Sequence, residues 1–180
     1  MSRAADLGFR AAGIDDAPGI HALVESAYRG DSSRVGWTTE ADLLDGQRID
    51  VPGVCELIAA STGRIVLACA ADGALLGCAN IQREGDACYF GMFSVRPILQ
   101  GGGIGDALLG ECERIARQEW HCRAMRMTVI WSREELIAWY QRRGYVATGE
   151  RKPFPYGDER FGKPRRDDLD FIVMSKPLAR

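Results

Sequence analysis

The sequence lacks any hydrophobic run long enough to cross a membrane. Its longest apolar stretches, Ile65–Ala71 and Ala74–Ile81, are interrupted by Asp72, Gly73 and Asn80, whereas a membrane-spanning helix needs about 20 apolar residues. The first residues, MSRAADLGFRAAG, have no continuous apolar core after the arginine and are therefore unlike a signal peptide. These absences predict a protein with no membrane partner.

Paired spacings of metal ligands are also missing. The cysteines at positions 55, 69, 78, 88, 112 and 122 include no C-x-x-C pair, and the chain has only two histidines. Structural zinc sites usually show such pairs, so no metal site is expected. Most of the cysteines lie in apolar runs, where a free thiol behaves as a small hydrophobic group. Free thiols suit a reducing compartment, so a cytoplasmic protein is expected.

The chain has no excess of charge of either sign. Lys and Arg number 23 against 25 Asp and Glu, which gives a net charge of −2. A dedicated nucleic-acid-binding domain is usually basic, so no nucleic-acid partner is expected. The 180 residues, 46% hydrophobic and 27% charged, fit a single globular domain over residues 1–180. An anionic ligand would have to be bound by local groups.

Periodicity and turn residues divide the chain into helices and strands. Strands are expected at about 7–12, 65–71, 74–83, 88–95, 125–129, 145–149 and 169–176. Helices are expected from Asp15 or Asp16 to Tyr28, from Thr38 or Thr39 to Leu44, over 54–60, over 104–116, and from a Ser132 cap to Gly144. The segment 151–168 is predicted to be a long loop.

Two features of this order define the fold class. The Asp72-Gly73 pair between apolar runs predicts a β-hairpin and hence antiparallel strands. The strand–helix–strand unit over 88–129 predicts parallel pairing. The chain therefore predicts an α/β (α+β) fold with a mixed sheet.

The most informative segment is glycine-rich and joins the strand at 88–95 to the helix after it. It runs Gln100-Gly101-Gly102-Gly103-Ile104-Gly105-Asp106. Glycine lets the backbone approach a ligand closely, and a helix N-terminus offers free N–H groups and the positive end of the helix dipole. The segment therefore predicts a site for a phosphate or pyrophosphate group. A glycine-rich turn without a ligand is the alternative.

Two common nucleotide motifs do not fit this segment. A P-loop ends in Gly-Lys-Ser/Thr, where this chain has Gly105-Asp106. A dinucleotide fingerprint needs G-x-G-x-x-G, but Asp106 or Leu108 takes the place of the third glycine. An ATP- or NAD-dependent enzyme stays open only as an alternative.

Two longer patterns surround the glycines. Gln100-x-x-Gly103-x-Gly105 follows Val95-x-Pro97 and precedes a leucine-rich helix. Downstream, the segment 135–145 (ELIAWYQRRGY) combines a helical tyrosine with a following glycine and aromatic residue. Together these patterns resemble the two motifs of the GNAT superfamily of N-acetyltransferases, and the order of elements fits over about 9–177.

The resemblance implies transfer of an acetyl group from acetyl-CoA to a primary amine of a small molecule or peptide, by direct attack in a ternary complex. It implies a mostly antiparallel sheet of about seven strands, splayed between strands 4 and 5, with CoA in the gap. Backbone groups would bind the pantetheine arm, and loop amides would hold the pyrophosphate. The cofactor-binding residues implied are Phe93, Ser94, Val95, Gln100, Gly101, Gly102, Gly103, Ile104, Gly105 and Asp106. Members of this family are often dimers, so a homodimer is compatible with the resemblance.

Acetyl transfer to an amine requires two proton movements. An alkylammonium group, with a pKa of about 10, must lose a proton before attack, and the leaving thiolate must gain one. Tyr140 matches the family position for that acid, and a phenol is protonated at neutral pH. A core role is the alternative for Tyr140.

The base is less well defined, because the strand over 88–94 has no carboxylate. Glu40 is the candidate, with Glu84 or a water relay as alternatives. The missing carboxylate also leaves open a non-catalytic acyl-CoA-binding regulator with the same fold.

The acceptor side has three aromatic candidates. Trp37 lies between the first helices, and Phe154 and Tyr156 lie in the late loop. Both segments commonly line the acceptor pocket in the resembled family. Where many members have an asparagine after the fifth strand, this chain has Ser132, which is expected instead to cap the following helix.

Overall fold

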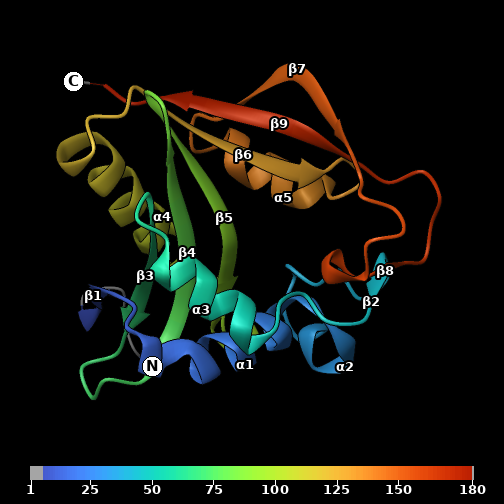
Figure 1. Cartoon of the computed structure of the whole chain (residues 1–180), viewed down its shortest axis with the longest axis horizontal. Coiled ribbons are helices and arrows are strands. Elements are labelled where there is room, and N and C mark those ends of the chain that lie inside the picture. Colours follow the sequence, from blue (N-terminus) through green and yellow to red (C-terminus); the bar gives the residue numbers. More distant parts are fainter. Residues whose placement is uncertain (1–5, 180) are drawn as a thin grey trace.

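The computed structural model describes residues 6–179. A seven-stranded sheet of order β1-β3-β4-β5-β6-β9-β7 forms the centre of this part of the chain (Figure 1). Its strands are β1 Gly8–Ala11, β3 Gly63–Cys69, β4 Leu75–Glu84, β5 Ala87–Val95, β6 Ala124–Ile130, β7 Val146–Pro153 and β9 Asp170–Pro177. Neighbouring strands are antiparallel except β5 and β6, which are parallel. The expected mixed, mostly antiparallel sheet is confirmed.

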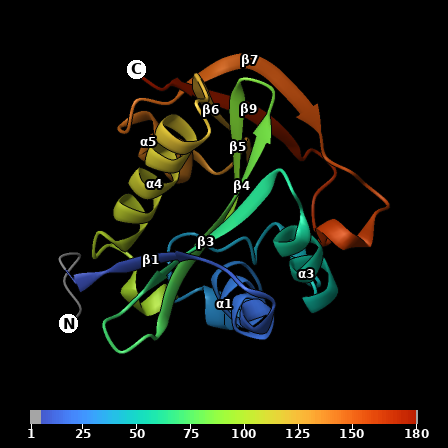
Figure 2. The ribbon, with the colours of Figure 1, turned by 60° about the vertical axis from the view of Figure 1, so that its left-hand side comes forward.

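Helices cover both faces of the sheet. The α-helices are α1 Ala17–Tyr28, α2 Gly30–Ser33, α3 Val51–Ala59, α4 Ile104–Arg114 and α5 Glu134–Gln141. Short helical turns are η2 Ile14–Asp16, η3 Pro97–Leu99, η4 Ile115–Glu119 and η5 Glu159–Phe161. α1 and α3 lie on one face, and α4 and α5 on the other (Figure 2). Within residues 6–179, no helix has the length and apolar character needed to cross a membrane.

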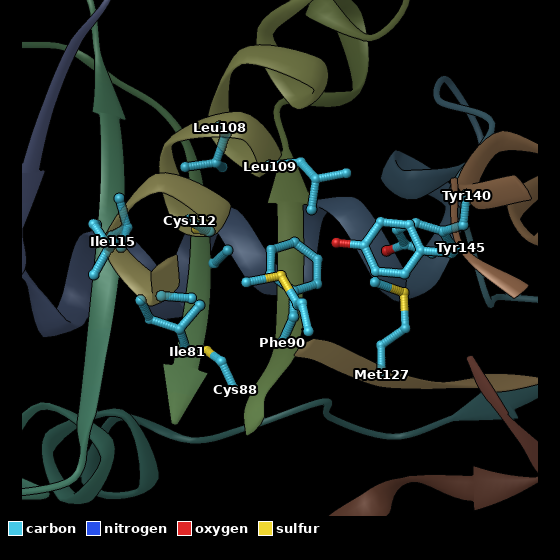
Figure 3. Close-up of a cluster of buried hydrophobic side chains, with 14 of the residues drawn as sticks. Ile81, Cys88, Phe90, Leu108, Leu109, Cys112, Ile115, Met127, Tyr140 and Tyr145 are labelled. Atoms are coloured by element: carbon cyan, nitrogen blue, oxygen red, sulfur yellow. The ribbon is translucent and has the colours of Figure 1, made fainter. Parts of the chain in front are cut away.

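Strand β3 is apolar at successive positions because helices cover both of its faces. Ile65 and Leu67 pack against α1 and α3, whereas Val66 and Ala68 belong to the core beneath α4. Successive side chains of a strand point to opposite faces, so a strand covered on both sides needs apolar residues at every position. The core under α4 also receives Phe90 of β5 (Figure 3).

A bulge in the β4–β5 pair changes which residues of β5 face each core. The register shifts between Cys78 and Asn80 of β4, and opposite this shift Met92 has a φ of 51°. Before the bulge Phe90 packs on the α4 side, whereas Met92 packs on the α1 side. Phe93 then packs on the α4 side again. An extra residue in one strand has this effect on side-chain alternation, and it turns Phe93 toward α5.

The parallel pair at the centre of the sheet is short. β5 and β6 pair only from Ala87–Ala124 to Tyr89–Arg126. Beyond these residues the two strands diverge, and β6, β9 and β7 turn away from β4 and β5 (Figure 1). β5 and β6 are the fourth and fifth strands in the sheet order, so the expected splay is confirmed.

The structure corrects three local predictions. Residues 38–44 form turns leading into the two-residue strand β2 Leu44–Asp45, not a helix. Ser132 does not cap α5, because its hydroxyl is buried without a partner among the described residues. The loop expected at 151–168 is shorter, because β7 continues to Pro153 and β8 Lys163–Pro164 pairs with β2.

The absence of the helix at 38–44 has a tertiary cause. The Thr39 hydroxyl bonds the hydroxyl of Ser33 at 2.5 Å and accepts from the Ala41 N–H at 3.1 Å. The Thr38 carbonyl accepts from Arg133. The Arg133 contact takes the Thr38 carbonyl, which a helix starting at Thr38 would use for its own first bond, and one helical turn forms in this segment, from the Leu44 N–H to the Glu40 carbonyl.

A substitution in α4 tests how much the core between this helix and the sheet contributes to stability. Leu108 is fully buried beneath α4 (Figure 3). Leu108→Ala is expected to lower the free energy of unfolding by about 3 kcal/mol, because it removes buried methyl groups and leaves a cavity. Urea unfolding of the purified protein measures this change. Ile98→Ala is the control, since Ile98 is 78% exposed and its change should stay within about 0.5 kcal/mol.

Candidate functional site

A cavity of about 600 Å³ lies over the glycine-rich loop. Its walls come from the loop, from β5, from α5 and from the segment at Trp37 and Thr38. Of the residues expected to bind a cofactor, Phe93, Val95, Gln100, Gly101, Gly103, Gly105 and Asp106 line it. Ser94, Gly102 and Ile104 do not. The side chains of Ser94 and Ile104 are buried elsewhere in the fold.

The glycines give the loop its shape. Gly101 and Gly103 have φ values of 86° and 88°, in the left-handed region where glycine is favoured. Gly103 is the residue before the first turn of α4. A Cβ on Gly105 would stand 3.1 Å from the Phe93 ring, so glycine there keeps the cavity open where α4 meets β5.

Gln100 connects the loop to a distant segment. Its side-chain oxygen accepts from the Trp37 N–H at 2.9 Å. Its amide nitrogen donates to the Thr38 hydroxyl at 2.8 Å and to the Val95 carbonyl at 3.1 Å. Gln100 therefore holds the segment at 37–38 as one wall of the cavity.

Asp106 does not present an unpaired negative charge to the loop. Arg143 donates to its carboxylate at 2.6 Å. The same guanidinium lies 3.6 Å from the centre of the Trp139 ring, at a distance typical of a cation–π contact. The Asp106 carboxylate, which would repel a phosphate if it were unpaired, is thus neutralised by a residue of the turn after α5.

A second cavity, of about 470 Å³, occupies the splay between β5 and β6. It is lined by Phe90–Phe93 of β5 and by Met127–Ile130 of β6. Phe93 lines both cavities, and of two adjacent residues of α5, Trp139 lines the first and Tyr140 the second. The two cavities therefore meet at Phe93 and α5.

Tyr140 lies at this meeting point. Its side chain is 4% exposed, and its ring contacts Phe93, Trp139 and Tyr145 at centroid distances of 6.5, 5.2 and 5.7 Å. No hydrogen-bond partner of its phenol occurs within residues 6–179. Burial, followed by the nearby phenol of Tyr28, raises the pKa of Tyr140 well above its ordinary value, so the phenol stays protonated at neutral pH.

Tyr145 is adjacent to Tyr140 but points into the core (Figure 3). It is 1% exposed, and its hydroxyl donates to Glu113 at 2.8 Å. It lines neither cavity.

Glu40 is a buried carboxylate between two guanidinium groups. Arg29 donates to one oxygen at 2.5 Å, and Arg133 donates to the other at 3.0 Å. Burial raises the pKa of Glu40, but the charges of Arg133, Arg29 and Arg48 outweigh it, and the net pKa is lowered. Glu40 therefore carries a charge that is fully committed to ion pairs.

The three aromatic residues expected to line the acceptor pocket lie in different places in the structure. Trp37 lines the cavity over the glycine loop, and Phe154 lines the splay cavity. Tyr156 lines neither cavity. Its hydroxyl accepts from the Leu169 N–H at 2.7 Å and donates to the Arg166 carbonyl at 3.1 Å, which fixes the late loop.

Sequence reasoning missed two arginines and one phenol of the splay cavity. Arg29 and Arg133 line it together with Arg48. So does Tyr28, whose hydroxyl donates a short hydrogen bond to the Phe93 carbonyl. These residues come from three distant segments, and no local pattern in the sequence joins them. Within residues 6–179, His, Cys, Asp and Glu side chains form no group that could hold a metal ion.

Comparisons with known protein folds agree with this architecture. The ribosomal-protein-S18-alanine N-acetyltransferase from Escherichia coli has a TM-score of 0.71 at 15% identity, with 97% of this chain and 95% of that chain covered. Nourseothricin acetyltransferase gives 0.68 at 20% identity, covering 97% and 99%. A chimera of spermidine N-acetyltransferase SpeG from Vibrio cholerae and hSSAT gives 0.69 at 16% identity, covering 96% of each chain. At such identities the likeness concerns the fold.

Sequence comparison supplies the family. A search of curated proteins found no match. Among protein families, residues 22–145 match the Acetyltransferase (GNAT) family. This segment holds the glycine-rich loop, Phe93 and Tyr140, and it is more than half of the chain. The chain therefore belongs to the acetyltransferase (GNAT) family and is an N-acetyltransferase.

Proposed function

We propose that this enzyme transfers the acetyl group of acetyl-CoA to a primary amine by direct attack, with the cofactor over the glycine-rich loop and the amine in the splay cavity. The observation that carries this proposal is the meeting of the two cavities at Phe93 and α5. A thioester at that junction would be accessible from both sides. The family membership supports acetyl-CoA as the acetyl donor.

The cofactor would be held mainly by backbone groups. The amides of residues 101–106 stand at the start of α4, where free N–H groups and the helix dipole favour a pyrophosphate. The backbone of Phe93, Ser94 and Val95 lies beyond the last β5–β6 pair at Tyr89, so it is the segment proposed to bind the pantetheine arm. Gln100 takes a supporting role, because its side chain already bonds Trp37, Thr38 and Val95.

The reaction forms a bond from the amine nitrogen to the carbonyl carbon and breaks the bond from that carbon to sulfur. The amine must enter as the free base, and the departing thiolate must gain a proton. Tyr140 is the proposed acid, because its phenol lines the splay cavity, stays protonated and has no other partner in the described chain. Holding the two reactants together supplies much of the acceleration.

Glu40 is better suited to holding neighbouring residues in position than to acting as the general base. Its carboxylate is paired with Arg29 and Arg133, so proton uptake would break a buried network. Arg133 also donates to the Thr38 carbonyl at 2.5 Å. Glu40 is therefore proposed to fix the 38–40 segment against α5. Glu84, at the exposed end of the splay cavity, or a water chain, then remains to take the proton of the amine.

The proposed cofactor site is tested by two valines placed on the same helix. Gly105→Val is expected to weaken acetyl-CoA binding by about 10-fold or more, because its side chain would enter the cavity beside the Phe93 ring. Gly110→Val is the matched control, since a Cβ there meets nothing within 4 Å. Calorimetric titration with acetyl-CoA measures both. Equal affinities for the two variants would place the cofactor elsewhere.

The proposed acid is tested by removing one hydroxyl. Tyr140→Phe should lower turnover by about 10²-fold, the usual worth of general acid catalysis, while the affinity for acetyl-CoA stays unchanged. Release of free CoA thiol with a panel of primary amines gives the rate. Tyr145→Phe is the control, because it loses a hydroxyl from the core and not from either cavity. A Tyr140→Phe enzyme as fast as the wild type would exclude Tyr140 as the acid.

The Glu40 network is tested by its contribution to stability. Glu40→Gln should lower the free energy of unfolding by about 3 kcal/mol at pH 7, because two buried guanidinium groups lose their counter-charge. Since the folded state lowers the pKa of Glu40, this contribution is present above the ordinary carboxyl pKa and is lost as the pH falls through the lowered value. Urea unfolding at several pH values measures it.

The matched control for Glu40→Gln is Glu150→Gln. Glu150 pairs with Arg126 at 2.7 Å on an exposed surface, where such pairs contribute less than about 1 kcal/mol. If both variants lowered the free energy of unfolding equally, the buried Glu40 network would stabilise the fold no more than an exposed ion pair does.

A further inference from the structure

We infer that the amine acceptor carries a carboxylate group, which the basic wall of the splay cavity binds. This inference rests on the proposed function, because it takes the splay cavity as the acceptor site. It selects a substrate class, namely small amino acids and related amino-carboxylates, over neutral amines and polyamines.

The charges that line the splay cavity do not balance. Its cationic side chains are Arg29, Arg48, Arg133 and Lys152, and its carboxylates are Glu40 and Glu84. The carboxylate of Glu40 is shared by Arg29 and Arg133. That leaves one counter-charge for two buried guanidinium groups.

Arg48 forms no ion pair with a carboxylate within the described residues, although its charge helps to lower the pKa of Glu40. Its guanidinium lies 5.7 Å from the centre of the Tyr28 ring, and that of Arg133 lies 5.8 Å from the same centre. Tyr28 donates to the Phe93 carbonyl, so this ring lies beside the junction of the two cavities. Two guanidinium groups thus flank the place where the acceptor amine must arrive.

Arg29 depends on Glu40 for its charge pairing. Its side chain is about 5% exposed, yet its Nε and one terminal nitrogen have no hydrogen-bond partner in the described chain. Buried donors of a charged group are costly to leave unsatisfied. The remaining terminal nitrogen of Arg29 is bound to Glu40, so Arg29 draws on the charge of the carboxylate that Arg133 also shares.

The volume of the splay cavity and the charges that line it limit which amines it can bind. A cavity of about 470 Å³ is in the range that holds small molecules. A polyamine would bring several positive charges next to Arg48 and Lys152. Of the two carboxylates that line this cavity, only Glu84 has no ion pair within the described residues. Like charges at such distances repel, whereas a carboxylate matches the planar fork of a guanidinium.

The test uses acceptors of equal length and different charge. One set is 4-aminobutanoate, n-butylamine and 1,4-diaminobutane, and the shorter set is glycine, ethylamine and 1,2-diaminoethane. CoA thiol release gives kcat/KM for each with the wild-type enzyme. In at least one set the carboxylate is expected to exceed its neutral partner by about 10-fold or more, the worth of one charge-assisted hydrogen bond. A preference for the neutral amine or the diamine in both sets would overturn the inference.

The variant Arg48→Gln assigns the preference to the basic wall. It should lower kcat/KM for the carboxylate acceptor by about 10-fold or more and for the neutral amine by less than about twofold. Arg117→Gln is the control, because Arg117 is exposed on η4 away from both proposed sites, and it should change neither value. Equal losses on the carboxylate and the neutral amine would contradict the role of Arg48.

A binding measurement keeps the inference testable without turnover. Calorimetry with CoA present compares N-acetyl-4-aminobutanoate and N-acetylglycine with N-butylacetamide and N-ethylacetamide. The carboxylate products are expected to bind more tightly, and Arg48→Gln should remove the difference. Equal binding of charged and neutral products would overturn the inference while leaving acetyl transfer intact. Absence of acetyl-CoA binding to the folded wild type would instead overturn the proposed function.

Discussion

The site depends on the early end of pairing between β5 and β6. Three residue pairs join these parallel strands, and beyond Tyr89–Arg126 the two strands separate. Backbone groups that a continuous sheet would use between its strands are thereby left for other partners, because buried N–H and C=O groups must be satisfied. The bulge at Met92 acts with the divergence, since it turns Phe93 toward α5. Both cavities result from these two departures from a regular sheet.

The open sheet is held in this form by polar contacts across the gap. Arg133, at the start of α5, reaches Glu40 and the Thr38 carbonyl on the far side. Gln100 makes the corresponding link from the glycine loop to Trp37 and Thr38. One short segment is thus fixed from both cavities, which links the cavity over the glycine loop to the splay cavity. The same segment fails to form a helix for that reason.

Charge placement distinguishes the two halves of the site. Over the glycine loop, Arg143 neutralises Asp106 and packs on Trp139, which leaves the loop amides as the anion-binding groups that we propose. In the splay, the arginines outnumber the carboxylates. The acceptor specificity we infer follows from that imbalance, whereas the fold shared with other acetyltransferases does not determine it. Proteins that share a fold at 15–20% identity can differ completely in the side chains of a pocket.

The sequence by itself determined the elements with strong local signals. The hairpin at Asp72-Gly73, the glycine loop, the long helix after it and the motif at Tyr140 are all encoded in consecutive residues, because turn chemistry and periodicity act over short ranges. Tertiary structure alone decided the rest. The ion pairs of Glu40, the position of Tyr156 and the cluster of Arg29, Arg48 and Arg133 join residues far apart in the chain. Burial of the Ser132 hydroxyl, which has no partner within residues 6–179, also depends on the folded chain. Burial and charge pairing, unlike turn formation, depend on neighbours that only the folded chain brings together.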